Sequence, residues 1–143
     1  MDYTWLIFAL LSAVFAALVT IFGKIGLESV DANAATMIRA GIMFSTLILI
    51  IIFTGKINDV STIFSNSNAM SWIFLSGVAG ALSWLFYFLA LKIGKISQVA
   101  PIDRLSIVFV IILAFLVIGE KINLKIAIGT AFMAIGAILI VLG

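Results

Sequence analysis

The sequence has 143 residues, of which 65% are hydrophobic and 10% are charged, whereas soluble domains contain about 45–50% apolar residues. This composition excludes an ordinary water-soluble domain, and a formal net charge of only +2 from scattered basic residues excludes a nucleic-acid surface. Cysteine and histidine are absent, which removes disulfides, the usual zinc and haem ligands, and catalytic sets that rely on Cys or His. We therefore expect no enzyme activity, no metal and no cofactor.

Five apolar runs, separated by polar breaks, follow one another along the chain. Each approaches the about 20 residues that an α-helix needs to cross the hydrocarbon core of a bilayer. The runs cover residues 4–22, 34–53, 70–91, 98–118 and 124–142. The sequence predicts an all-α integral membrane protein in which residues 1–143 form one domain of five transmembrane helices, surrounded by the lipid bilayer.

Residues 54–69 form the longest polar stretch between two spans. Four apolar residues within it have the spacing of a short amphipathic helix on the membrane surface. They are Ile57, Val60, Ile63 and Phe64. A solvated loop is the alternative interpretation. Farther along the chain, Gly119 follows the fourth run, and because glycine commonly caps helix C-termini, we expect the fourth helix to stop there.

The lysines of the connections are balanced across the membrane. With five spans, the second and fourth connections lie on one side and the first and third on the other, and each side then has three lysines. One side has Lys56, Lys121 and Lys125, and the other side has Lys24, Lys92 and Lys95. The positive-inside rule therefore gives no orientation from the loops. Either the first helix sets a single orientation, or the chain inserts both ways, in dual topology, and two copies pair antiparallel.

Three ionisable residues lie inside the predicted spans, where an unpaired charge is costly. They are Arg39, Asp103 and Arg104. Arg39 either extends to the membrane interface, or it faces the interior to pair with Asp103 or to meet an anionic group of a substrate. Asp103 follows Pro101, which we place in the first turn of the fourth helix. The Asp103 carboxylate serves either as a structural ion pair or cap, or in proton or cation coupling.

The third predicted span carries small and hydroxyl-bearing side chains along one helical face. That face holds Ser76, Gly80, Ser83 and Tyr87, with Trp84 beside it. Close helix packing, for which membrane proteins use small residues, is one explanation of the pattern. The functional interpretation is a pocket for an organic or cationic ligand beside an aromatic ring. Its predicted substrate-binding residues are Ser83, Trp84, Tyr87 and Arg39.

Several short motifs occur in a characteristic order along the whole chain. They are Trp5, Gly23-Lys24, Arg39, Ala90-Leu91-Lys92, Ile93-Gly94-Lys95-Ile96-Ser97-Gln98-Val99-Ala100-Pro101, Ile118-Gly119-Glu120-Lys121-Ile122 and Ile128-Gly129. In this order they resemble the EamA-type repeat of the drug/metabolite transporter superfamily. The resemblance implies a multi-pass transporter of small metabolites in the plasma or inner membrane, in a family where many proteins carry two inverted five-helix repeats.

On this resemblance the chain corresponds to one half-size repeat. We therefore expect two copies to form a homodimer, most simply antiparallel, around a cavity lined by the first four helices of each. The related small multidrug resistance proteins exchange protons at a Glu in their first helix. The first span of this chain has no acidic residue, so Asp103 is only a positional substitute for that Glu.

Two functional hypotheses follow from the sequence. In the first, the chain is a secondary transporter or exporter of a small polar or amphipathic organic metabolite that works by alternating access in the cell membrane. Its substrate meets Ser83, Trp84, Tyr87 and Arg39, and Asp103 with Arg39 forms the coupling site or ion pair. In the second, the chain is a non-transporting membrane subunit or assembly partner, or a component of a flippase for a lipid-linked substrate.

Overall fold

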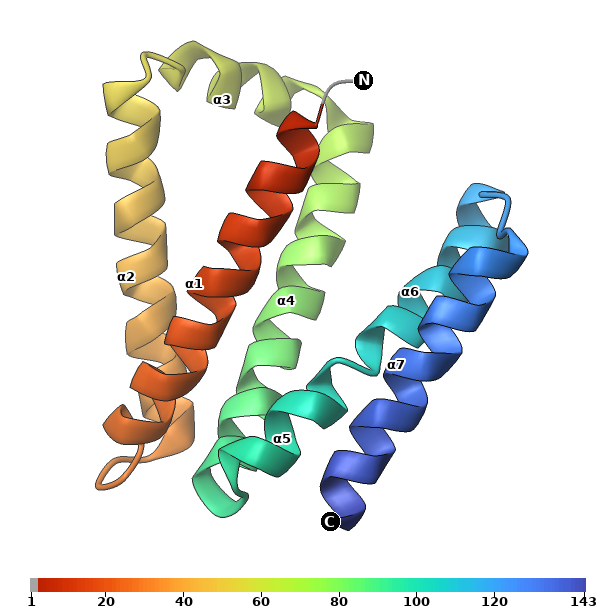
Figure 1. Cartoon of the computed structure of the whole chain (residues 1–143). Helices are drawn as coiled ribbons and strands as arrows, with labels where there is room; N and C mark the ends of the chain where they lie inside the picture. The colour runs from red at the N-terminus through yellow and green to blue at the C-terminus, as the bar shows by residue number, and fades with distance from the viewer. Residues whose placement is uncertain (1–2) are drawn as a thin grey trace. The chain divides into compact units, whose positions relative to one another are not determined.

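The computed structural model describes residues 3–143, and every regular element within them is a helix (Figure 1). The elements are α1 (Thr4–Gly26), α2 (Ala32–Phe53), α3 (Ile57–Ser65), α4 (Ser67–Ile93), α5 (Ile96–Asp103), α6 (Ser106–Leu113), the π-helical η1 (Ala114–Ile118) and α7 (Leu124–Leu142). Five segments are long and apolar enough to cross a membrane, namely Thr4–Gly26, Ala32–Phe53, Ser67–Ile93, Ile96–Ile118 and Leu124–Leu142. The all-α fold class and the five predicted spans are therefore confirmed.

The chain divides into two compact units. The central unit is Ile25–Lys92, which contains α2, α3 and α4. The terminal unit joins the N-terminal segment, up to Lys24, to Ile93–Gly143, and it combines most of α1 with α5, α6, η1 and α7. The sequence predicts that residues 1–143 form one domain. That the two units assemble into one domain in the bilayer stays a prediction.

Two polar side chains cap the N-termini of the long helices of the central unit. The Asp31 carboxylate accepts a hydrogen bond from the Ala34 backbone N–H at 2.9 Å. The Asn66 side-chain oxygen accepts one from the Ala69 backbone N–H at 3.1 Å. Each bond satisfies a donor that the first helical turn leaves without a partner. For this reason α2 and α4 begin at these caps, two to three residues ahead of the predicted apolar runs.

The polar stretch between the second and third spans folds as the helix α3 and not as a loop. α3 lies across the ends of α2 and α4 (Figure 1). Its apolar side chains Ile57, Ile63 and Phe64 are 61%, 40% and 67% exposed, a surface that the lipid headgroup region would cover. The helical interpretation is confirmed, and the position of α3 on the membrane surface stays a prediction.

Lys92, in the last turn of α4, bonds the chain segment that follows α1. Its ammonium donates hydrogen bonds to the backbone carbonyls of Leu27 and Val30, the second at 2.9 Å. Beside it the Leu91 and Leu27 side chains are 0% and 1% exposed. One cation therefore satisfies carbonyls in the segment after α1, next to the most deeply buried side chains of the described chain.

We expect Lys92→Met to destabilise the protein by about 1–3 kcal/mol, because the substitution leaves these carbonyls without a charged donor. The matched control is Lys95→Met, since the Lys95 side chain is exposed and makes no hydrogen bond within residues 3–143. The midpoint of thermal unfolding in detergent measures both effects. Equal midpoints for the two variants would show that the Lys92 bonds contribute nothing.

The fourth span consists of three short helices, α5, α6 and η1, and not of one regular helix. α5 begins at Ile96, so Pro101 lies in its second turn, where it removes a backbone donor from the helix interior. The expectation that Pro101 occupies the first turn is wrong for this reason. The backbone N–H groups of Leu105 and Val108 bond carbonyls three residues earlier, at 2.9 Å and 3.0 Å. These tighter turns break the span around Arg104.

The fourth span ends at Gly119, as the sequence predicted. Gly119 has φ = +76°, a left-handed conformation that costs other residues about 1–2 kcal/mol. The backbone N–H of Glu120 bonds the Ala114 carbonyl at 3.1 Å and closes the wide last turn. The next helix, α7, has Asn123 as its side-chain cap, and it packs against α5 and α6.

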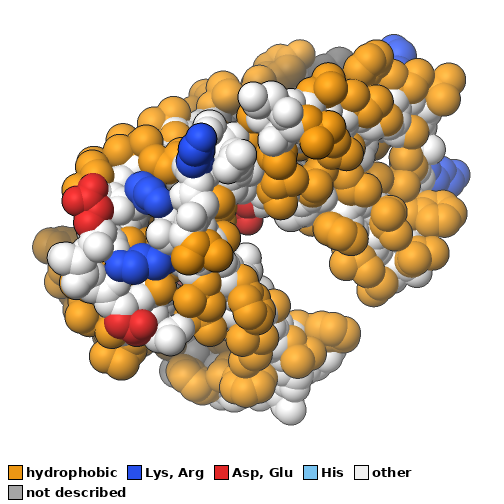
Figure 2. All heavy atoms as spheres, turned by 90° about the horizontal axis from the view of Figure 1, so that it is seen from below, with side chains coloured by type: hydrophobic (Ala, Val, Ile, Leu, Met, Phe, Trp, Pro, Cys, Tyr) orange, Lys and Arg blue, Asp and Glu red, His pale blue; other side chains and the backbone are white. Residues whose placement is uncertain are grey.

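Large apolar side chains cover the outer surfaces of the helices. Phe53 and Ile93, for example, are 86% and 91% exposed in the protein. Hydrophobic side chains cover most of the surface seen in Figure 2, and the charged ones gather in limited parts of it. Hydrocarbon tails cover such a surface without the penalty that water imposes. The exposed apolar surface therefore fits a multi-pass membrane protein.

Candidate functional site

The central unit stacks a cation from α2 on an aromatic ring of α4. The guanidinium carbon of Arg39 lies 3.6 Å from the centroid of the Trp84 ring and 5.3 Å from that of Phe88. Both distances allow cation–π attraction. Guanidinium C–N bonds are about 1.3 Å long. With the central carbon only 3.6 Å from the Trp84 ring centroid, a guanidinium that met the ring edge-on would bring one of its nitrogens too close to the ring atoms. The flat face of the guanidinium therefore lies on Trp84, and we call these two residues the stacked pair.

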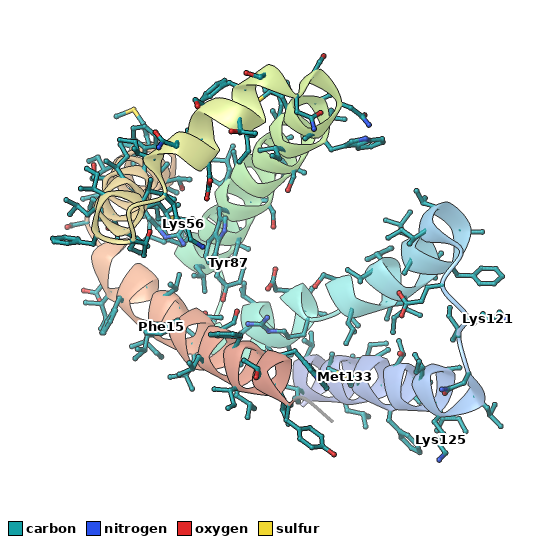
Figure 3. The ribbon with its side chains drawn as sticks, turned by 90° about the horizontal axis from the view of Figure 1, so that it is seen from above. Phe15, Lys56, Tyr87, Lys121, Lys125 and Met133 are labelled. Atoms are coloured by element: carbon teal, nitrogen blue, oxygen red, sulfur yellow. The ribbon has the colours of Figure 1, made fainter. Side chains whose placement is uncertain are left out.

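Two further rings of α4 support the stacked pair. The Tyr87 and Phe88 rings meet the Trp84 ring edge to face, at centroid distances of 5.7 Å and 6.0 Å. Residues three and four positions apart share one helical face, which explains these contacts. Tyr87 points from α4 toward α2 (Figure 3), and Tyr87 and Phe88 are only 9% and 4% exposed. The Trp84 ring is therefore held in place by buried neighbours.

The stacked pair lies well inside the spans. Arg39 is seven residues after the start of α2 and Trp84 is nine before the end of α4, or about 10–14 Å along the helices at about 1.5 Å per residue. These two helix ends are on the same side of the unit, because Lys92 bonds the chain just before α2. The guanidinium is closer to the deeper Trp84 ring than to Phe88, so it is not extended toward the interface.

The guanidinium of Arg39 has no acidic partner within the central unit. The carboxylates of that unit are Glu28, Asp31 and Asp59, all outside the spans. Inside the unit the guanidinium forms neither an ion pair nor a hydrogen bond. Its five N–H donors lie in its plane, whereas the stacking uses only its face. The edges of the guanidinium are therefore left to groups outside the central unit.

The structure brings three of the four predicted substrate-binding residues together. Arg39, Trp84 and Tyr87 belong to one group of contacts, whereas Ser83 is exposed and takes no part in the ring contacts. The covered face of α4 passes through Trp84, Tyr87 and Phe88, and Ser83 is exposed beside it. Substrate binding by these residues stays a prediction.

Phe88 is the member of this group that the sequence analysis does not name. Its ring is 5.3 Å from the Arg39 guanidinium and 6.0 Å from the Trp84 ring. The signal was present in the sequence, since Phe88 follows Trp84 by four residues and so lies on its face. Trp84 was placed beside the face of Ser83 and Tyr87, and the residues that share the face of Trp84 itself were therefore not considered.

Asp103 lies at the end of α5, directly before the break in the fourth span. Its side chain is half-buried and forms no ion pair or hydrogen bond within the terminal unit. It does not cap α5, whose N-cap is Lys95. Because Arg39 belongs to the central unit, the pairing of these two residues stays a prediction, as does the coupling role. Within residues 3–143, no cluster of three or more Asp or Glu side chains suits a metal ion.

Five apolar helices of bilayer length, two of which hold a cation stacked among aromatic rings, define a multi-pass membrane protein. The chain belongs to the EamA-like transporter family, whose pattern it matches over residues 3–142. The resemblance stated from the sequence is therefore confirmed, and the chain is a half-size repeat. Membership of this family points to a membrane transporter.

A relative in a Sinorhizobium species extends this comparison. That protein is named an uncharacterized transporter in the cobO 3′ region, and it is 43% identical to this chain over 142 residues. The alignment covers 98% of each chain, so the relative has nearly the same length. No solved structure matches the chain.

Proposed function

We propose that the protein is a secondary transporter of a small polar or amphipathic organic metabolite that works by alternating access in the cell membrane. The stacked pair carries this proposal, because a permanent cation lies deep in the spans without an acidic partner in its unit. Charged side chains at such positions characteristically face a solute path or a water-filled cavity. Family membership supports the same conclusion.

The working assembly in this proposal is a homodimer of five-helix repeats. The family resemblance implies two repeats around one cavity, and this chain supplies one. Several glycines of the spans have open space beside them, since an added Cβ would meet no atom within 4 Å. They are Gly41, Gly77, Gly80, Gly129 and Gly136. Membrane helices pack closely through such small residues, so these faces are suited to a second copy of the chain.

Flux through purified protein in liposomes tests the proposed function. We expect saturable uptake of at least one class in a panel of labelled amino acids, organic acids, amines and sugars. Liposomes without protein provide the background. Monodisperse, folded protein that gives no flux across the panel would overturn the proposal and favour a non-transporting subunit.

Antiparallel pairing predicts that each connection is present on both sides of the membrane. Cysteine is absent from the chain, so a single introduced cysteine is the only thiol that a reagent can label. Ser29→Cys places the thiol in the connection before α2, and Ser61→Cys places it in α3, which follows the other end of α2. In intact vesicles we expect a membrane-impermeant maleimide to label roughly half of each variant, as dual topology requires. Complete labelling of one variant and none of the other would establish a single orientation.

A further inference from the structure

We infer that the stacked pair binds the carboxylate of a small organic anion or zwitterion, an assignment that rests on the proposed function and specifies its substrate. The geometry of Arg39 supports this inference directly. The face of the guanidinium is occupied by the Trp84 ring at 3.6 Å, and the Phe88 ring lies beside it at 5.3 Å. The N–H donors point outward in the guanidinium plane, where a carboxylate binds with two parallel hydrogen bonds.

The charge balance of the central unit favours an anion over a neutral or cationic ligand. Arg39 is the one charged side chain of that unit that lies well inside a span, since Lys92 is in the last turn of α4, and the unit offers Arg39 no carboxylate. An unpaired charge in low dielectric is unfavourable, and an entering carboxylate neutralises it while completing its hydrogen bonds. An amine would add a second positive charge at the same place, and a neutral amide would leave the charge uncompensated.

The aromatic rings fix where the carboxylate binds. Contacts of Trp84 with Tyr87 and Phe88 hold its ring, and the stacking in turn holds the guanidinium of Arg39. A flexible arginine would lose side-chain entropy on binding, whereas a stacked one has already been ordered. The same rings offer an apolar wall to the rest of a substrate.

The depth of the stacked pair distinguishes a free carboxylate from a lipid headgroup. Arg39 lies about 10 Å along α2 from its first residue, at about 1.5 Å per residue. Lipid phosphates belong to the interfacial region outside the hydrocarbon core. A small solute in a wetted path reaches this depth more readily than a phosphate attached to a bilayer lipid. We therefore assign the site to a free organic carboxylate.

Fluorescence of Trp84 tests this assignment without requiring transport. The chain has three tryptophans, so Trp5→Phe with Trp72→Phe leaves Trp84 as the only one. In an uncharged detergent without lipid, this protein is titrated with benzoate, benzamide and benzylamine, and with hexanoate and its neutral amide. We expect each carboxylate to bind at least about 10-fold more tightly than its amide, in keeping with hydrogen bonds to a charged group, and the amine to bind no better than the amide.

Variants of Arg39 complete the test. Arg39→Gln should bind carboxylate and amide equally, Arg39→Lys should fall between, and Arg104→Gln should behave as the unsubstituted protein. Equal binding of carboxylate and amide by the unsubstituted protein would overturn the assignment, and so would a preference that survives in Arg39→Gln. In a separate titration, anionic phospholipid is added to the same detergent solution. A response to the phospholipid but to no soluble carboxylate would overturn the assignment in favour of a lipid site. Because binding alone is measured, carboxylate selectivity without flux would contradict only the proposed function.

Discussion

Arg39→Gln will lower saturable flux at limiting substrate concentration by roughly 10- to 100-fold, the range expected for lost hydrogen bonds to a charged group. The guanidinium forms no hydrogen bond or ion pair within the central unit, so in the proposed transporter its N–H donors bind the substrate. Glutamine keeps two N–H donors on a shorter side chain but removes the charge and the planar fork. The stacking on Trp84 at 3.6 Å is lost as well.

Loss of the Arg39 guanidinium should change the two kinetic constants of flux to different extents. An interaction that binds the substrate raises the concentration for half-maximal flux more than it lowers the maximal rate. Uptake measured over a range of substrate concentrations separates the two quantities. Arg104→Gln is the matched control, because Arg104 is exposed and lies outside the stacked pair. Equal flux parameters for Arg39→Gln and Arg104→Gln would contradict a substrate role for Arg39.

The second large effect is expected at Asp103, whose change to Asn should abolish the stimulation of flux by an imposed pH gradient. Asp103 precedes the break in the fourth span, and non-helical backbone at membrane depth is tolerated where it is buried in protein or lines a water-filled path. In the proposed transporter this carboxylate is the coupling group, and an amide of the same shape cannot replace it, because an amide has no acidic proton to transfer.

Uptake with and without a pH gradient measures this effect. Asp59→Asn is the control, since Asp59 lies in the first turn of α3, outside the spans. We expect gradient-driven accumulation to fall at least about 10-fold in Asp103→Asn, because a side chain without an ionisable group transfers no proton, and to persist in Asp59→Asn. Unchanged gradient dependence in Asp103→Asn would exclude Asp103 as the coupling group.

The architecture was predictable because bilayer thickness and backbone chemistry act locally along the chain. The five spans follow from the length of the apolar runs. The helix α3 follows from apolar spacing within residues 57–64, and the end of the fourth span follows from the left-handed Gly119. Each of these features depends on neighbours in sequence, so a single sequence contains the information.

The features that require knowledge of which helix faces meet were not predictable. The stacking of Arg39 on Trp84, and the part of Phe88 in it, depend on how α2 faces α4. The bonds of Lys92 to carbonyls after α1 join residues more than sixty positions apart. The break in the fourth span was missed because α5 begins earlier than predicted, which moves Pro101 out of the first turn. The candidate residues were therefore predictable from the sequence, whereas their contacts are visible only in the fold.

Counterflow in proteoliposomes tests the central claim, alternating access through the Arg39 site, most directly. Liposomes loaded with an unlabelled carboxylate substrate are diluted into a low concentration of the same compound in labelled form, without any ion gradient. We predict transient accumulation of label above the equilibrium level, and its loss in Arg39→Gln but not in Arg104→Gln. Uptake of label that is indifferent to the internal substrate would contradict the account.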